Sequence, residues 1–328
     1  MSTTDSVRLA TVTELWRYPV KSMRGERCDV LNVSMQRCEG DHLFGVLDET
    51  SGMVMSAKRH GQLLLARARY DAAGAVWVEL PDGTRHEAGS AGCDRAMSDW
   101  LDRPVRVIEP EDGVTYEFEI NEPDQLDSDP AWFTFPSAPG SLFDGRSSIH
   151  AVLTSGLGAA HALAPDSSWA VSRFRPQFVL DDLPFVVTAG SAGAAGPTNT
   201  AGPTSTASTD STAGAAGSGG TAGPAGPTST ASNSGAAGLD VGFLEAAWPG
   251  RDVRVGAEVV CTVRKRTERC VLTTRPQGPP DGESHELGRD RDVLRTLSTH
   301  TDSLFGLYFD PTAGGAVRIG DPVTVETA

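Results

Sequence analysis

The sequence predicts a mainly β fold with some helices (α+β), arranged as two β-barrel-like domains. Three observations predict it: short segments rich in β-branched and aromatic residues, turn signals between them, and few stretches with helical periodicity. Many short strands with few helices favour β-barrels or mixed β/α modules over a doubly wound sheet. The length of 328 residues is enough for two domains, each with its own core.

Local patterns predict several elements in chain order. AVWVELPDGT (75–84) predicts a strand that ends in a turn at its Pro-Asp-Gly. SAGCDRAMSDWLDR (90–103) predicts a helix, because its apolar residues fall on one helical face and Ser90 can cap its N-terminus. A second helix is expected at GLGAAHAL (156–163), capped by Thr154 or Ser155, and a third at DVLRTLSTH (292–300).

A segment of low complexity separates two globular stretches. Residues 188–238 are almost entirely Ala, Gly, Ser, Thr and Pro, and the octamer AGPTSTAS occurs there twice. Such a composition cannot bury enough apolar surface to offset the entropy of ordering, so we expect a disordered insert. Because the sequences on both sides are rich in β-branched and aromatic residues, we expect a loop within one domain and not a linker between two.

Composition and charge exclude several classes of protein. A net charge of -15 argues against binding to nucleic acid or to an anionic membrane surface. Five cysteines without CxxC spacing argue against a disulfide scaffold, a structural zinc site or an iron–sulfur cluster. The N-terminus does not resemble a signal peptide, and no apolar stretch is long enough for a membrane span. We therefore expect a soluble, cytoplasmic protein with reduced cysteines.

Cys270 lies in the most basic stretch of the chain, RKRTERCVLTTRPQG. Neighbouring positive charge favours the thiolate, which is a good ligand for a soft or high-valent transition metal. Thr273 and Thr274 follow it and can donate hydroxyl hydrogen bonds to an anion. The alternative is a buried cysteine in a strand beside solvated arginines. The cations near it in the sequence are Arg264, Lys265, Arg266 and Arg269.

Two further motifs carry groups suited to an anion. Lys21 and Ser22 follow Pro19, and a lysine beside a hydroxyl at a strand end suits a phosphate; an ordinary surface lysine is the alternative. Arg173 and Arg175 share a face if they lie on a strand, and two adjacent guanidiniums need an anion or carboxylates between them. The carboxylates available nearby in the sequence are those of Asp181 and Asp182.

The pair Lys58 and Arg59 precedes an apolar run in SAKRHGQLLLARARY. A charge pair at the start of a helix or strand is usually solvated. This pair is therefore a weaker indication of an anion site than the other two motifs.

Taken together, these stretches resemble the MOSC family, the molybdenum-cofactor sulfurase C-terminal domain proteins. Within that family they are most similar to the two-part proteins related to the mitochondrial amidoxime-reducing component. LWRYPVKSMRGE, GDHLFGVLDETSGMVMSAKR and VWVELPDG resemble the β-barrel domain that precedes MOSC in this group. VSRFRPQFVLDD, RCVLTT, SLFGLYF and VRIGDPVTV resemble the MOSC domain itself.

The resemblance implies domain boundaries and roles for individual residues. It implies an N-terminal domain at 1–125 and a MOSC domain at 140–328 that contains the 188–238 insert. Cys270 matches the family cysteine that binds molybdenum through its thiolate. The cofactor's anionic pterin is then expected to contact residues in a pocket between the two domains: Lys21, Ser22, His42, Lys58, Arg59, Arg173, Arg175, Thr273 and Thr274.

The chain departs from its relatives at three places. His42 stands where relatives usually carry the arginine of a Gly-Asp-Arg motif. Gln177 stands where they often carry the asparagine of Arg-Pro-Asn, and Arg275-Pro276-Gln277 replaces a common acidic Asp-Pro turn. The resemblance is therefore a weaker guide to the substrate face of the site than to the cofactor site.

The activity that the resemblance implies is reduction of N-hydroxylated or N-oxide compounds by a molybdenum-cofactor-dependent oxidoreductase. The chain has no flavin or nicotinamide fingerprint, so electrons would come from a partner such as a ferredoxin or a flavin reductase. One alternative is sulfur transfer through a Cys270 persulfide, with the sulfur supplied by a separate desulfurase, since no pyridoxal-phosphate lysine domain is present. Another is a non-enzymatic carrier of the cofactor.

Overall fold

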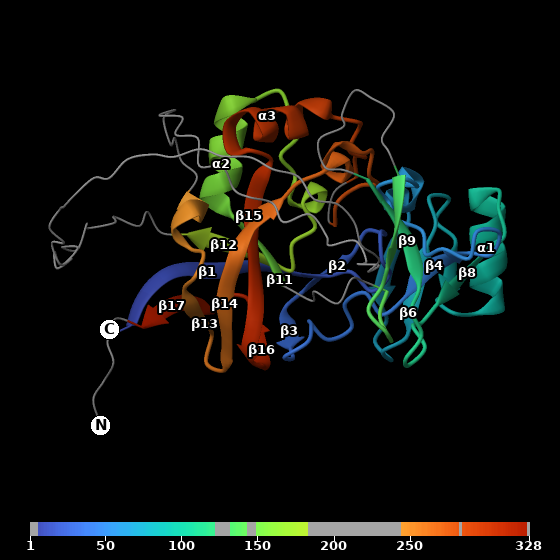
Figure 1. Ribbon diagram of the computed structural model, residues 1–328, viewed down its shortest axis with the longest axis horizontal. Helices are drawn as coiled ribbons and strands as arrows, with labels where there is room; N and C mark the ends of the chain where they lie inside the picture. The colour runs from blue at the N-terminus through green and yellow to red at the C-terminus, as the bar shows by residue number, and fades with distance from the viewer. Residues whose placement is uncertain (1–5, 122–131, 143–148, 183–243, 282–283, 327–328) are drawn as a thin grey trace, which may run out of the picture. The chain divides into compact units, whose positions relative to one another are not determined.

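The computed structural model describes residues 6–121, 132–142, 149–182, 244–281 and 284–326. Within these ranges the protein is mainly β with three α-helices, which confirms the predicted fold class (Figure 1). The low-complexity stretch at 188–238 lies outside the described residues. The boundaries 1–125 and 140–328 stay a prediction, although the first strand of the chain belongs to the same sheet as the C-terminal strands.

Seven strands form a closed barrel, because the first and last strands of the series also pair with each other. The order around the barrel is β12, β11, β15, β14, β13, β17 and β1, and β2 pairs with β1 outside this ring. These strands are β1 (Ser6–Arg17), β2 (Glu26–Cys28), β11 (Ile149–Leu153), β12 (Phe178–Asp182), β13 (Asp252–Val255), β14 (Val259–Glu268), β15 (Leu304–Ala313) and β17 (Pro322–Glu326).

Apolar side chains at alternate positions fill the barrel. On β14, Val259, Cys261 and Val263 are buried while the residues between them are partly exposed. This alternation is the two-residue period of a strand with one face in the core. At the closing seam, Leu15 of β1 lies opposite Phe178 of β12, and both side chains are fully buried.

The N-terminal part of the chain contributes smaller sheets around a separate apolar cluster. One pair, β3 with β16, joins the N-terminal part to the C-terminal strands. These elements are β3 (Val30–Val33), β4 (Gly45–Asp48), β5 (Arg67–Tyr70), β6 (Val76–Glu79), β7 (Arg85–Glu87), β8 (Val105–Ile108), β9 (Glu117–Asn121), β10 (Trp132–Pro136) and β16 (Gly315–Arg318).

Two of the three predicted helices are confirmed in detail, one by its N-terminal cap and the other by its buried apolar face. Ser90 accepts a hydrogen bond from the Cys93 amide at the start of α1 (Ala91–Leu101). Helix α3 (Arg291–Thr301) buries Val293, Leu294 and Leu297 and is capped by Asp290. Both helices have strong local signals, a capping side chain and an apolar face of helical period.

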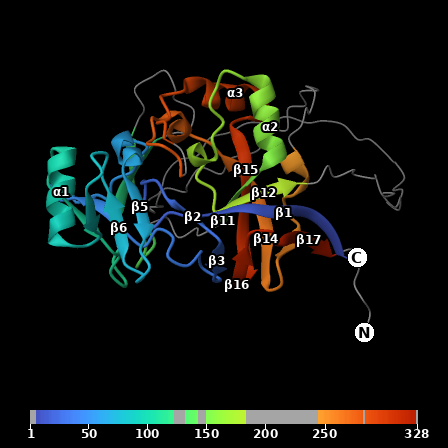
Figure 2. The ribbon, with the colours of Figure 1, turned by 180° about the vertical axis from the view of Figure 1, so that it is seen from behind.

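The cap predicted for the remaining helix is wrong. Helix α2 (Thr154–Leu163) begins at Thr154 itself and has no side-chain cap. The Thr154 and Ser155 hydroxyls instead donate to Asp181 and Asp182 at the end of β12. Helices α2 and α3 contact each other and lie side by side over one end of the barrel in both views (Figures 1 and 2). Among the described residues, no helix has the length and apolarity needed to cross a bilayer.

The closing seam of the barrel leads to a stability prediction. Replacing Phe178, which is 0% exposed, with alanine removes a large side chain where β1, β11 and β12 meet. We expect the free energy of unfolding to fall by about 3–5 kcal/mol in urea titrations. Phe135→Ala on β10 is the control, since Phe135 is 39% exposed. Equal losses in the two variants would mean that the seam is not part of the stable core.

Candidate functional site

Cys270 lies where β14 has ended and a turn begins. Its backbone is extended and caps the 3-10 helix η4 (Val271–Thr274). The thiol is free and only partly buried, so the alternative of a fully buried strand cysteine is wrong. The thiol is thus presented at the end of a strand and not within one.

The positive charge near Cys270 comes from different residues than the sequence pattern suggests. Arg264 pairs with Asp310, and Lys265 is exposed. Arg269 and Arg275 interact electrostatically with Cys270. Burial lowers the pKa of both arginines, and the negative charge of Cys270 partly opposes this. Arg264 and Lys265 lie within β14, where side chains alternate between its two faces, whereas Arg269 and Arg275 flank the turn that holds Cys270.

Arg269 is buried and holds three segments together. Its Nε donates to the Phe305 carbonyl at 2.7 Å, and its Nη1 donates to the Phe174 carbonyl at 3.2 Å. Its Nη2 contacts Nε2 of the buried His150. Since an arginine can only donate, Nε2 of His150 is the acceptor, and its Nδ1 carries the proton. Burial, followed by the charge of Arg269, lowers the pKa of His150 well below its usual value, which agrees with a neutral ring.

This contact requires a glycine at position 306. Gly306 has a φ of 84°, and a Cβ there would lie 2.5 Å from Nε2 of His150. Neither the Arg269–His150 contact nor the need for Gly306 was predicted from the sequence. The partners are more than 100 residues apart in the chain, and no local pattern connects them.

Glu245 also contacts Gly306 and is fully buried. Its Oε2 accepts from the Gly306 amide at 2.8 Å and lies 3.8 Å from Nε of Arg266. Burial raises the pKa of Glu245 to about 7, and the Gly306 hydrogen bond and the charges of Arg266 and Arg269 only partly oppose this. The carboxyl is therefore close to half protonated near neutral pH.

Arg173 braces the turn that follows Cys270. This side chain is 1% exposed and donates to the carbonyls of Thr273, Arg275 and Gly288. The Thr273 and Thr274 hydroxyls donate back to carbonyls within the same turn, those of Cys270 and Val271. The three predicted anion-binding side chains therefore hold the shape of the turn, and their contact with a cofactor stays a prediction.

Arg175 does not share a strand face with Arg173. Arg173 ends the 3-10 helix η2 (Val171–Arg173), and Arg175 follows in a turn with a φ of 52°. The Arg175 guanidinium lies 4.2 Å from the centre of the Tyr18 ring and donates to the Met23 carbonyl. The alternative of pairing with Asp181 and Asp182 is not observed among the described residues, where both aspartates bind the start of α2.

Lys21 and Ser22 lie in the connection between β1 and β2. Lys21 is only 8% exposed, so the alternative of an ordinary surface lysine is wrong. Its Nζ donates to the Leu142 carbonyl at 2.8 Å and lies 4.0 Å from the centre of the Phe118 ring. The Ser22 hydroxyl accepts from the Ala57 amide at 2.9 Å, with Ser22 itself at a φ of 70°.

His42 interacts with an acidic partner. Its Nδ1 contacts Asp41, which also accepts from the Tyr18 amide at 2.7 Å and from Nε2 of Gln177 at 3.0 Å. The two residues that depart from the family pattern, His42 and Gln177, thus share one carboxylate. No local sequence pattern indicates this link, because 135 positions separate the two residues along the chain.

Lys58 and Arg59 have different surroundings. The Lys58 carbonyl accepts from Nη2 of Arg275 at 2.6 Å, which joins the 56–60 loop to the turn after Cys270. Arg59 is exposed, pairs with Glu119 and lies 5.2 Å from the Trp132 ring. Hydrogen bonds therefore connect Ser22, the 56–60 loop and the Cys270 turn, whereas Arg59 is directed toward β9 and β10.

Comparisons with known proteins identify two regions of the chain. A family profile described as the MOSC N-terminal beta barrel domain matches residues 9–112, and one described as the MOSC domain matches residues 231–324. Together they cover more than half of the chain. A solved structure of the YUAD protein from Bacillus subtilis aligns over 99% of this chain and 98% of its own, with 9% identity and a TM-score of 0.41. No curated protein matches.

The buried Glu245 makes stability depend on pH. Between its ordinary pKa of 4.5 and about 7, the folded state keeps the proton that the unfolded state releases, so the free energy of unfolding falls as pH rises. The Gln side chain of Glu245→Gln stays neutral at every pH. We therefore expect the free energy of unfolding of this variant, relative to that of the native chain, to rise by on the order of 3 kcal/mol from about pH 4.5 to 7.5.

Urea titrations at a series of pH values measure this difference. Glu87→Gln, at an exposed position on β7, is the matched control. A difference between Glu245→Gln and the native chain that is constant over pH would contradict the prediction.

Proposed function

Because this chain belongs to the MOSC family, with a MOSC N-terminal β-barrel domain ahead of the MOSC domain, we propose that it binds a molybdenum cofactor through Cys270. MOSC domains are associated with proteins that bind this cofactor. We further propose that the protein is an oxidoreductase that reduces small N-hydroxylated or N-oxide compounds.

The accessible, cation-flanked thiol of Cys270 is the observation that carries the proposal. Cys38, Cys93 and Cys261 are buried, and burial raises the pKa of Cys28 to about 11. Cys270 instead is partly exposed and interacts electrostatically with Arg269 and Arg275. A thiol in such surroundings is suited to act as a thiolate ligand.

The residues around the turn fit an anionic cofactor. Nε of Arg275 is buried and has no hydrogen-bond partner among the described residues, although Nη2 of the same side chain is bound to Lys58. A buried donor without an acceptor is costly, and an oxyanion would satisfy it. Lys21 adds a buried ammonium group, which donates to the Leu142 carbonyl and lies over the Phe118 ring.

Each of the chain's own residues has a stated task in this proposal. Cys270 would provide the protein ligand to the metal, with the cations Arg269 and Arg275 close to it. Arg173 keeps the turn in place by occupying the carbonyls of Thr273, Arg275 and Gly288. The bound cofactor would supply two-electron chemistry that removes oxygen from a substrate nitrogen. Electrons would reach it from a partner protein such as a ferredoxin or a flavin reductase.

A second candidate function is supported by the same exposed thiol. Cys270 would carry a persulfide and transfer its sulfur, which a separate desulfurase would have to supply. A third candidate is a carrier that binds the cofactor and passes it on without turnover. Bound molybdenum distinguishes the first candidate from the second, and turnover with a chemical reductant distinguishes an enzyme from a carrier.

The proposal predicts that metal content depends on Cys270. In protein purified from a host that makes the cofactor, we expect about one molybdenum and one pterin per chain. Cys270→Ser should lose most of the molybdenum, because a hydroxyl is a far poorer ligand than a thiolate. Mass spectrometry of the metal and fluorescence of the oxidised pterin measure both quantities.

Cys28→Ser is the matched control, since Cys28 is also a partly exposed free cysteine. It should retain the metal at the level of the native chain. Native protein without molybdenum but with a labile sulfur on Cys270 would overturn the proposal in favour of sulfur transfer.

A further inference from the structure

A small cavity lies at the junction of the N-terminal and C-terminal parts of the chain, and Cys270 does not line it. Its walls come from the end of β1, the start of β5, the η2 turn and the segment 277–281. The side chains used below are those of Arg24, Arg67, Ser172, Arg175, Gln277 and Asp281. Arg175 is the residue that the cavity shares with the predicted cofactor site.

Five of these side chains carry a buried polar atom without a hydrogen-bond partner in the described part of the chain. The amide of Gln277 is the clearest case, because the residue is 1% exposed and its Nε2 has no acceptor. A single buried donor of this kind costs about 1–3 kcal/mol. The other four atoms are Nε of Arg24, Nε of Arg67, Nη2 of Arg175 and Oγ of Ser172.

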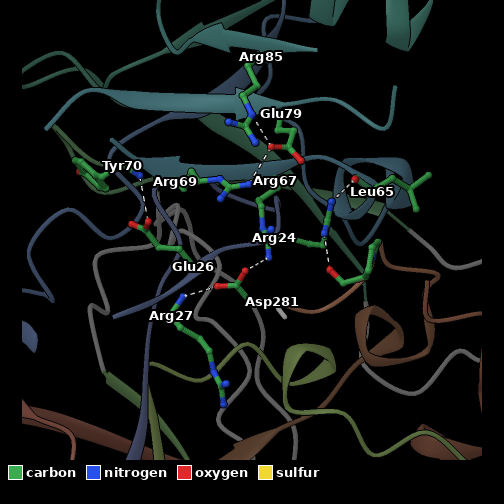
Figure 3. A network of polar contacts seen from close by, with 11 residues as sticks. Arg24, Glu26, Arg27, Leu65, Arg67, Arg69, Tyr70, Glu79, Arg85 and Asp281 are labelled. Carbon is green, nitrogen blue, oxygen red and sulfur yellow. Dashed lines mark hydrogen bonds and ion pairs between the residues drawn. The ribbon is translucent and has the colours of Figure 1, made fainter. Parts of the chain in front are cut away.

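The remaining contacts of these arginines prevent them from turning away. Arg24 donates to the Pro279 and Leu65 carbonyls, and Arg67 donates to Asp281 (Figure 3). Arg175 is held by the Met23 carbonyl and the Tyr18 ring. Each guanidinium is thus held by other contacts, while one of its N–H groups is left without an acceptor.

The cavity walls have an excess of positive charge. Three guanidiniums, those of Arg24, Arg67 and Arg175, face one carboxylate, Asp281, among the lining residues. Burial lowers the pKa of Arg24 to about 10, and the charge of Arg67 is the next largest cause. In Figure 3 the Arg24 and Arg67 side chains lie next to each other, with Asp281 joined to Arg67. Like charges so placed repel unless a negative group lies between them.

A water molecule does not match this set of groups. One water accepts only two hydrogen bonds, whereas four nitrogen donors and a hydroxyl on the lining residues lack a partner. An anion accepts from all of them and also reduces the repulsion between the guanidiniums.

We propose that this cavity is an anion-binding site, distinct from the Cys270 turn, for one small inorganic anion of the halide or phosphate type. The anion bridges Arg24, Arg67 and Arg175, and Gln277 and Ser172 complete its shell. It joins the β1–β2 connection to the segment that follows the Cys270 turn. The site does not require the cofactor, so it stands or falls independently of the proposed function.

Thermal unfolding of the full-length chain tests the site. Sodium chloride or sodium phosphate is added at constant ionic strength to protein in a buffer whose only other anion is a large sulfonate. We expect the unfolding midpoint to rise with one of the two anions and to saturate, as it does for a ligand that binds only the folded state. Whichever anion acts identifies the occupant as halide or oxyanion.

Variants then locate the effect. Gln277→Leu removes one donor while keeping the backbone pairing of Gln277 with Leu287, and we expect it to weaken the apparent affinity for the anion at least tenfold. Arg67→Gln should weaken it further, because it removes a charge. Arg85→Gln is the matched control, since Arg85 pairs with Glu79 and does not line the cavity.

Two results would overturn the proposal. One is a native chain whose midpoint does not change with either anion. The other is an anion response of the same size in Gln277→Leu, Arg67→Gln and Arg85→Gln. The second outcome would mean that the anion acts on the general surface charge of the molecule.

Discussion

The geometry around Cys270 depends on the buried guanidinium of Arg269. A buried cation is tolerated only when its donors have acceptors, and Arg269 finds them on Phe305, Phe174 and His150. These residues belong to β15, to the turn after η2 and to β11, so one side chain ties three segments to the end of β14. The position at which β14 stops is therefore set from outside the strand. Because Cys270 follows Arg269 directly, the same contacts determine where its thiol emerges.

Asp41 is a second constraint, and it connects two departures from the family pattern. Its carboxylate accepts from the Tyr18 amide and Gln177 and contacts His42. A change at one of these positions alters the hydrogen bonding or charge that the shared carboxylate presents to the other. Residues that share a partner in this way have non-additive effects on stability, so His42 and Gln177 form a coupled pair.

How much could be predicted from the sequence depended on whether the signal was local. Helices α1 and α3 were predicted because a capping side chain and an apolar face lie within one short segment. The cap of α2 was not, since the Thr154 hydroxyl binds Asp181 of another element. In the site, Cys270 was identified from its motif, but its cationic neighbours were only partly identified. Arg275 faces the turn because of its long-range bond to Lys58, and the positive φ of Arg175 has no signature in the sequence.

The chain has a net charge of -15 but keeps buried positive charge around the Cys270 turn. The hydrogen-bond acceptors of the buried arginines explain how. Arg173 donates to three backbone carbonyls, and Arg269 donates to two carbonyls and a neutral imidazole. A carbonyl satisfies a donor without cancelling its charge, whereas a carboxylate would do both. The arginines are thus fixed in place while their positive charge remains. Other arginines, such as Arg17 and Arg69, pair instead with the carboxylates of Glu26 and Glu79 at partly exposed positions. Charge that is immobilised but not neutralised can attract an anion without further rearrangement. At the small cavity lined by Gln277, Arg24 and Arg175 are likewise held by backbone carbonyls.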